Sequence, residues 1–166
     1  MKRTKTLAVC SLMAAMCVAI LALGSLFEVM DVTVAIVAGL VVMIVDTEYG
    51  FRAGLSVFLV AGFLALLLPV KFPAVFFIAL GGWYPLVQKS IHLRTPVVAA
   101  VIKFLIFNGV LTILLLLSAF VMGVREAGWV YPVLYVMGNV CFFMYDILLD
   151  RFMLWYILKL RNRLKF

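Results

Sequence analysis

Long apolar segments separated by short polar connections run through the whole chain. In order, these segments are residues 6–26, 33–45, 51–68, 74–91, 97–121 and a last one that begins near Val130. A run of about twenty apolar residues is long enough, as an α-helix, to cross the hydrocarbon core of a bilayer. The pattern therefore predicts an all-α, polytopic membrane protein with a six-transmembrane-helix bundle.

Two of these segments depart from the simple pattern. The segment 33–45 is short for a span, so we expect it to lean on its neighbours or to borrow Asp46 and Thr47 from the turn that residues 46–50 are predicted to form. The segment 74–91 is interrupted at residues 81–85 by Gly-Gly-Trp-Tyr-Pro, which should kink the helix or partly unwind it. A plain proline kink and a broken helix facing a cavity both fit this stretch.

The composition supports the membrane assignment. Of the 166 residues, 68% are hydrophobic and 13% are charged, whereas a soluble domain has about 25% charged residues. We expect one membrane domain over residues 1–166. Residues 152–166 form a basic amphipathic tail, which either extends the last helix or lies along the lipid headgroups.

The basic residues are distributed unevenly between the two predicted sides. With six spans and the N-terminus inside, the outer side has only Lys71 and Arg125. The inner side holds Lys2, Arg3, Lys5, Arg52, Lys89, Arg94, Arg151, Lys159, Arg161, Arg163 and Lys165. This asymmetry predicts a multi-pass protein of the cell membrane with both termini in the cytoplasm. It also accounts for the net charge of +7 without nucleic acid as a partner.

One cation and one carboxylate lie inside predicted spans. Lys103 is about two turns from the inner end of its helix, and the next helix runs the other way and brings Asp146 to a similar depth. We therefore predict that Lys103 and Asp146 form a buried pair, with Asn108 and Asn139 further toward the midplane. Such a seam either binds substrate or joins the two helices.

A second group of polar and aromatic residues is expected near the outer ends of the helices. Mixed charge with aromatic side chains can hold a small, flat polar ligand, although interfacial aromatics are also ordinary in membrane helices. This outer group is Glu28, Asp31, Lys71, Arg125, Glu126, Trp129, Tyr131 and Tyr135, and together with Trp83 and Asn139 it makes up the candidate substrate-binding residues.

We expect neither catalysis nor a bound metal or cofactor. The chain has no phosphate-binding GxxxxGK[ST] loop, no GxSxG and no HExxH. Its three cysteines lie within apolar runs, and His92 has no second metal ligand near it in the sequence.

The first helix carries small residues on one face. They recur every three or four positions, at Ala8, Ser11, Ala15, Ala19 and Ala22. Small residues let another helix approach closely within a membrane. This face either packs within the same chain or docks onto a separate membrane subunit.

The basic N-terminus, the Ala15-x-x-x-Ala19 motif in this small-residue face, and six predicted spans with both ends inside together resemble the substrate-binding S component of energy-coupling factor (ECF) transporters. The resemblance implies that Ala15 and Ala19 dock on a transmembrane coupling subunit. It further implies that outer loops and helix ends bind a vitamin or similar micronutrient, and that separate ATPase subunits drive the S component to topple in the membrane. The missing phosphate-binding loop fits this division of labour.

Two other functions are compatible with the sequence. One is a cell-envelope scaffold that resembles the small polytopic rod-shape-determining protein, which has a similar length and helix count and needs no ligand. The other is a lipid-handling or channel-like protein that uses the inner polar seam.

Overall fold

The computed structural model describes residues 2–24, 31–68, 72–91, 96–121 and 128–160. Regular structure within these ranges is entirely helical, without any β-strand, which confirms the all-α prediction. The chain forms two compact units, which are residues Met1–Ala100 (unit 1) and Val101–Phe166 (unit 2).

The helices follow the predicted segments closely. Unit 1 contains α1 (Lys2–Gly24), α2 (Asp31–Tyr49), α3 (Phe51–Ala65), α4 (Phe72–Phe76), the π-helix η1 (Phe77–Gly81) and α5 (Tyr84–Ile91). Helix α6 (Pro96–Val121) leads into unit 2, where α7 (Val130–Trp155) and the π-helix η2 (Tyr156–Leu160) follow.

Among the described residues, four helical stretches are long and apolar enough to cross a membrane. They are Thr4–Gly24, Asp31–Tyr49, Val97–Phe120 and Val130–Lys159. The stretches Phe51–Ala65 and Phe72–Gln88 are apolar but shorter. The coordinates thus support a helical protein suited to a bilayer, with four of the six predicted spans at full length.

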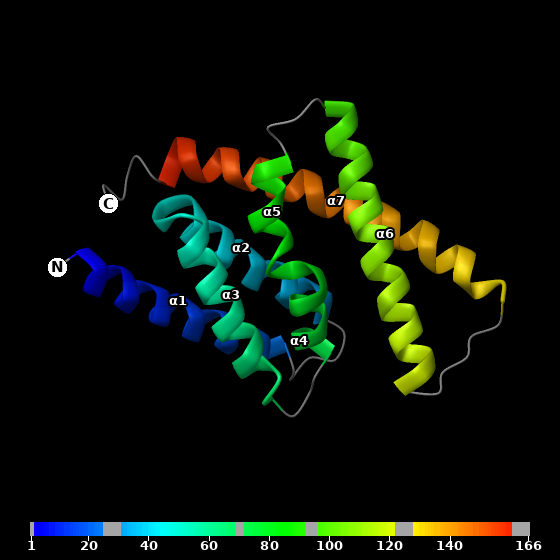
Figure 1. Ribbon diagram of the computed structural model, residues 1–166, viewed down its shortest axis with the longest axis horizontal. Helices are drawn as coiled ribbons and strands as arrows, with labels where there is room; N and C mark the ends of the chain where they lie inside the picture. Colours follow the sequence, from blue (N-terminus) through cyan, green and yellow to red (C-terminus); the bar gives the residue numbers. More distant parts are fainter. Residues whose placement is uncertain (1, 25–30, 69–71, 92–95, 122–127, 161–166) are drawn as a thin grey trace. The chain divides into compact units, whose positions relative to one another are not determined.

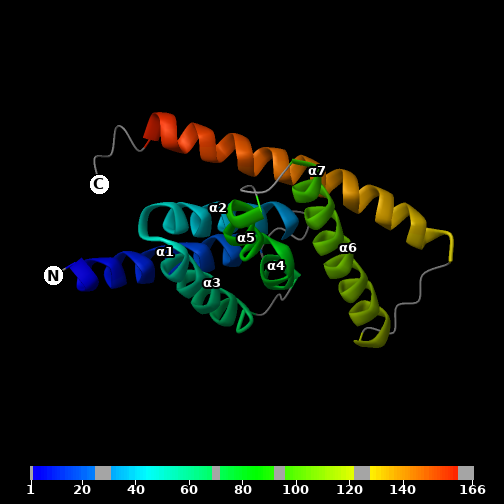
Figure 2. The ribbon, with the colours of Figure 1, turned by 45° about the horizontal axis from the view of Figure 1, so that its top comes forward.

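Small buried side chains hold α1, α2 and α3 together, and Figures 1 and 2 show these helices packed side by side. The core includes Ala14, Cys17, Ala38, Ala61 and Ala65, each at most 3% exposed. Because lipid tails are as apolar as leucine, close approach of backbones rather than exclusion of water joins such helices.

A single residue, Gly50, connects α2 to α3. Its φ of 87° lies in the left-handed region that glycine adopts without strain. The prediction of a turn over residues 46–50 was wrong, because α2 continues to Tyr49. The hydroxyl of Thr47 donates to the carbonyl of Met43 at 2.8 Å, which lets this polar residue remain in the helix. The expected borrowing of Asp46 and Thr47 is therefore confirmed.

The predicted interruption of the fourth segment is present as a break rather than as a plain proline kink. The backbone N–H of Gly82 donates to the carbonyl of Phe77 at 2.7 Å, a π-type bond, before α5 begins at Tyr84. The indole Nε1 of Trp83 donates to the carbonyl of Ala79 at 2.6 Å, so the side chain satisfies a backbone group at the break. Pro85 lies in the first turn of α5, where its missing N–H costs no hydrogen bond.

In unit 2, α6 and α7 cross each other (Figures 1 and 2). Helix α7 runs without interruption into η2 and so reaches Leu160, which shows that the first part of the tail extends the last helix. The rest of the tail, residues 161–166, lies outside the described residues.

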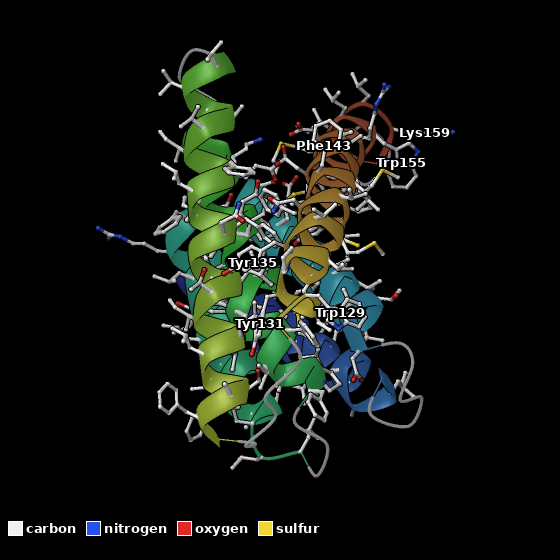
Figure 3. All side chains as sticks on the ribbon, turned by 90° about the vertical axis from the view of Figure 1, so that its right-hand side faces the viewer. Trp129, Tyr131, Tyr135, Phe143, Trp155 and Lys159 are labelled. Carbon is white, nitrogen blue, oxygen red and sulfur yellow. The ribbon has the colours of Figure 1, made fainter. Side chains whose placement is uncertain are left out.

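Aromatic residues mark both ends of α7. Trp129 lies at one end and Trp155 and Lys159 lie at the other (Figure 3). The 26 positions between the two tryptophans correspond to about 39 Å of helix, close to the full thickness of a bilayer with its headgroups. Tryptophan favours this interfacial position.

Candidate functional site

A row of polar side chains, here called the polar seam, joins α6 to α7. It has three levels, each made by one residue from each helix: Lys103 with Asp146, Asn108 with Asn139, and Thr112 with Tyr135. Because α6 and α7 run in opposite directions, residues of increasing number along α6 face residues of decreasing number along α7, which gives the successive levels of the seam.

The first level is the ion pair expected from the sequence. The ammonium Nζ of Lys103 lies 2.9 Å from Oδ1 and 2.8 Å from Oδ2 of Asp146. The two side chains are 9% and 18% exposed. Each charge compensates the other. Removing either one would leave an unpaired buried charge, which has a high cost in free energy.

At the second level, the amides of Asn108 and Asn139 bond to each other in both directions. Nδ2 of Asn108 donates to Oδ1 of Asn139 at 3.0 Å, and Nδ2 of Asn139 donates to Oδ1 of Asn108 at 3.1 Å. Each amide also donates to a carbonyl one turn back in its own helix, that of Phe104 at 2.9 Å and that of Tyr135 at 2.8 Å. Each asparagine is therefore held in its orientation by its own helix as well as by its partner.

The third level is a hydroxyl pair. Oγ1 of Thr112 donates to the carbonyl of Asn108 at 2.7 Å and lies 2.7 Å from the hydroxyl of Tyr135. A threonine hydroxyl has one proton, so the hydroxyl of Tyr135 is the donor between the two.

Aromatic rings lie beside the first and second levels of the seam. The rings of Phe107 and Phe142 stack with centroids 4.4 Å apart and planes 15° apart. Gly138 provides room beside them, since a Cβ there would lie 3.4 Å from the tip of the Phe107 ring and 3.2 Å from Leu111. The seam thus combines fixed polar groups with flat apolar surfaces.

The small-residue face of α1 is a separate feature. Ala15 and Ala19 are exposed, as are Ala8 and Ser11, and Ala22 is half-buried. The helix packs into its unit through another face, which carries Ala14, Cys17 and Leu21. The rest of unit 1 therefore leaves the face that carries Ala15 and Ala19 uncovered.

Four of the ten candidate substrate-binding residues, Glu28, Lys71, Arg125 and Glu126, lie outside the described residues. Asp31 begins α2, and its buried Oδ1 has no hydrogen-bond partner among the described residues.

The remaining members of the cluster separate into different surroundings. Trp83 bonds within its own unit, and Trp129 is 73% exposed. Tyr131 and Tyr135 lie on the side of α7 that faces α6 (Figure 3). Tyr135 and Asn139 are the two candidate substrate-binding residues that belong to the polar seam.

Sequence reasoning missed one seam residue, Thr112, and the two stacked rings beside the seam, Phe107 and Phe142. The signal for Thr112 was its position four residues after Asn108, on the adjacent turn of one helix. The two phenylalanines lie among many others in apolar runs, where nothing local distinguishes a stacked ring from one that faces lipid.

The chain was compared with models of known protein families, with curated proteins and with solved structures, and none of them matches it.

Proposed function

We propose that the chain is the substrate-binding membrane subunit of an ECF-type uptake transporter for a micronutrient such as a vitamin. The observation that supports this most directly is the exposure of Ala15 and Ala19 on α1. A face of small residues left open by its own bundle offers a coupling subunit a place for close helix contact.

The proposal includes the finer topology. Six spans, with α3 and the stretch Phe72–Gln88 as the two short ones, bring both termini to the cytoplasmic side of the cell membrane. The distribution of lysine and arginine favours this orientation. Ligand would enter from outside, and ATPase subunits bound to the coupling subunit would drive its release inside.

The broken helix over η1 and α5 also supports a transport function. Interrupted helices and π-type turns recur at functional positions in membrane proteins. Here the backbone carbonyls of Ala79 and Phe77 at the interruption accept hydrogen bonds from the indole of Trp83 and the N–H of Gly82.

Docking can be tested with Ala15→Trp. Because Ala15 is exposed, the larger side chain should leave folding intact but separate α1 from a partner helix. We expect at least a tenfold loss in the yield of a co-purified coupling subunit and ATPases, with an unchanged elution volume of the chain alone.

Met16→Trp is the matched control, since Met16 is 43% exposed and lies on a different face of the same helix. It should leave complex yield unchanged. An equal yield for Ala15→Trp would refute docking through this face, and repeated recovery with cell-wall synthesis proteins instead would favour the envelope scaffold.

A further inference from the structure

The amide pair Asn108–Asn139 forms the centre of the polar seam. Asn108 lies near the middle of α6, twelve positions from Pro96 and thirteen from Val121. Ligand sites of membrane transporters also lie near the bilayer midplane. If α6 spans the bilayer, Asn108 lies near the midplane, where little water competes for the amides.

Each amide group is held in its orientation by a hydrogen bond to its own helix, independently of the other amide. If the two asparagines part, each keeps the bond to its own helix, from Nδ2 to the carbonyl of Phe104 or of Tyr135. Each then presents one N–H donor beside one oxygen acceptor in a fixed orientation. A fixed donor and acceptor side by side are complementary to a cyclic amide, whose N–H and C=O lie on one edge.

Counting the hydrogen bonds defines the class of ligand. Separation breaks the two bonds between Asn108 and Asn139. A planar ring with two amide units offers an N–H and a C=O to each asparagine, so about four bonds replace two. Because an unsatisfied amide is costly in the membrane, a ring with no amide edge is excluded from this position.

The surroundings add two further requirements. The stacked rings of Phe107 and Phe142 show that flat groups fit side by side next to the amides. Lys103 lies five positions from Asn108, or about 7.5 Å along the helix. Its ammonium contacts both carboxylate oxygens of Asp146, and because an ammonium has three protons it can also donate to an anion.

We propose that the amide pair Asn108–Asn139 is the binding site for a planar cyclic diamide that carries a carboxylate, with the ring between the two asparagines and the carboxylate on Lys103. Tyr131 and Tyr135 lie between this site and the Val130 end of α7, on the side of the helix that faces α6 (Figure 3). This inference rests on the proposed uptake function for its direction of entry, whereas binding itself requires only the seam.

The test is calorimetric titration of the purified full-length chain in lipid nanodiscs with three probes. Orotate has two amide units and a carboxylate, uracil has the amide units alone, and benzoate has a flat ring and a carboxylate without amides. We expect saturable binding of orotate, binding of uracil about tenfold weaker because a charge-assisted bond is lost, and no saturable binding of benzoate.

Two variants assign the binding to its residues. Replacing both asparagines, with Asn108→Leu and Asn139→Leu, removes the amides together and leaves no unpaired group, so the helices can still pack; orotate binding should be lost. Lys103→Met with Asp146→Leu should reduce orotate binding to the level of uracil and leave uracil unchanged. Elution volume and melting temperature confirm that each variant is folded.

Several outcomes would overturn the inference: no saturable binding of either diamide, benzoate binding as tightly as orotate, or orotate binding that survives the double asparagine replacement. If these occur while the wild-type chain still co-purifies with a coupling subunit, the inference fails and the transporter proposal stands. If orotate binds as expected but no coupling subunit is recovered, the seam is a ligand site and the transporter proposal fails.

Discussion

Helices of unit 1 pack through apolar side chains, many of them small, whereas α6 and α7 meet through polar side chains that bond to each other as well as through stacked aromatic rings. In unit 1 a Cβ on Gly81 would lie 2.6 Å from the carbonyl oxygen of Ala35, so η1 and α2 are nearly in backbone contact. In unit 2 the connection is made by the three levels of the polar seam.

The difference has a mechanical consequence. When closely packed helices separate, their dispersion contacts are lost together, because dispersion falls steeply with distance. A polar group that loses one hydrogen-bond partner can instead bond to another at little net cost in free energy. The helices of unit 1 are thus suited to remaining packed, and the polar seam is suited to exchanging one hydrogen-bond partner for another.

The largest effect is expected from removing one charge of the seam. Asp146→Leu leaves the buried ammonium of Lys103 without its carboxylate and should lower the free energy of unfolding by about 3–5 kcal/mol. The comparison is with the double replacement Lys103→Leu/Asp146→Leu, which should recover most of the loss. Chemical denaturation in mixed detergent and lipid micelles measures both, and an equal loss in the double variant would show that the loss does not come from the unpaired ammonium.

A smaller effect is expected from disturbing the close approach in unit 1. In Gly81→Ala the new methyl group meets backbone atoms of Ala35 and should cost about 1–3 kcal/mol. Gly109→Ala on α6 is the matched control, since no atom lies within 4 Å of a Cβ there. It should be neutral or stabilising by up to about 1 kcal/mol, because alanine is the better helix former. Melting temperatures that fall equally for both would contradict the packing account.

The smallest effect on stability is expected from single hydroxyl groups, and it distinguishes a hydrogen bond between two helices from one within a single helix. Thr112→Val removes the acceptor for Tyr135 and should cost about 0.6 kcal/mol, the mean for such bonds in a membrane protein. Thr47→Val removes only a bond to its own helix and should change stability less. The same denaturation assay distinguishes them, and a larger loss at Thr47 would reverse the assignment.

The sequence predicts a contact of this structure when the positions of the two residues along their helices are enough to bring them together. The pair of Lys103 with Asp146 followed from depth in two antiparallel helices, and so did the placing of Asn108 and Asn139 beyond it. The role of Tyr135 in the seam did not follow, because its partner Thr112 sits in an apolar run where its hydroxyl already bonds to its own helix.

Other features depend on tertiary contacts that no local pattern contains. The small residues of α1 were evident, but the sequence left open whether they face inward, since the opposite face with Ala14 and Cys17 is also small. The end of α2 was misplaced because residues 46–49 are polar, and the bond from Thr47 to Met43 lets the helix continue through them.

The short length of α3 has a consequence for the surrounding lipid. Its fifteen residues measure about 22 Å along the axis, against about 30 Å for the hydrocarbon thickness of a typical bilayer. If α3 crosses the membrane, as the proposed six-span topology requires, lipid beside it has to shorten its acyl layer locally or leave polar helix ends immersed, at an energetic cost for each ångström of mismatch. Under that topology, membranes with shorter or more disordered acyl chains should accommodate the protein best.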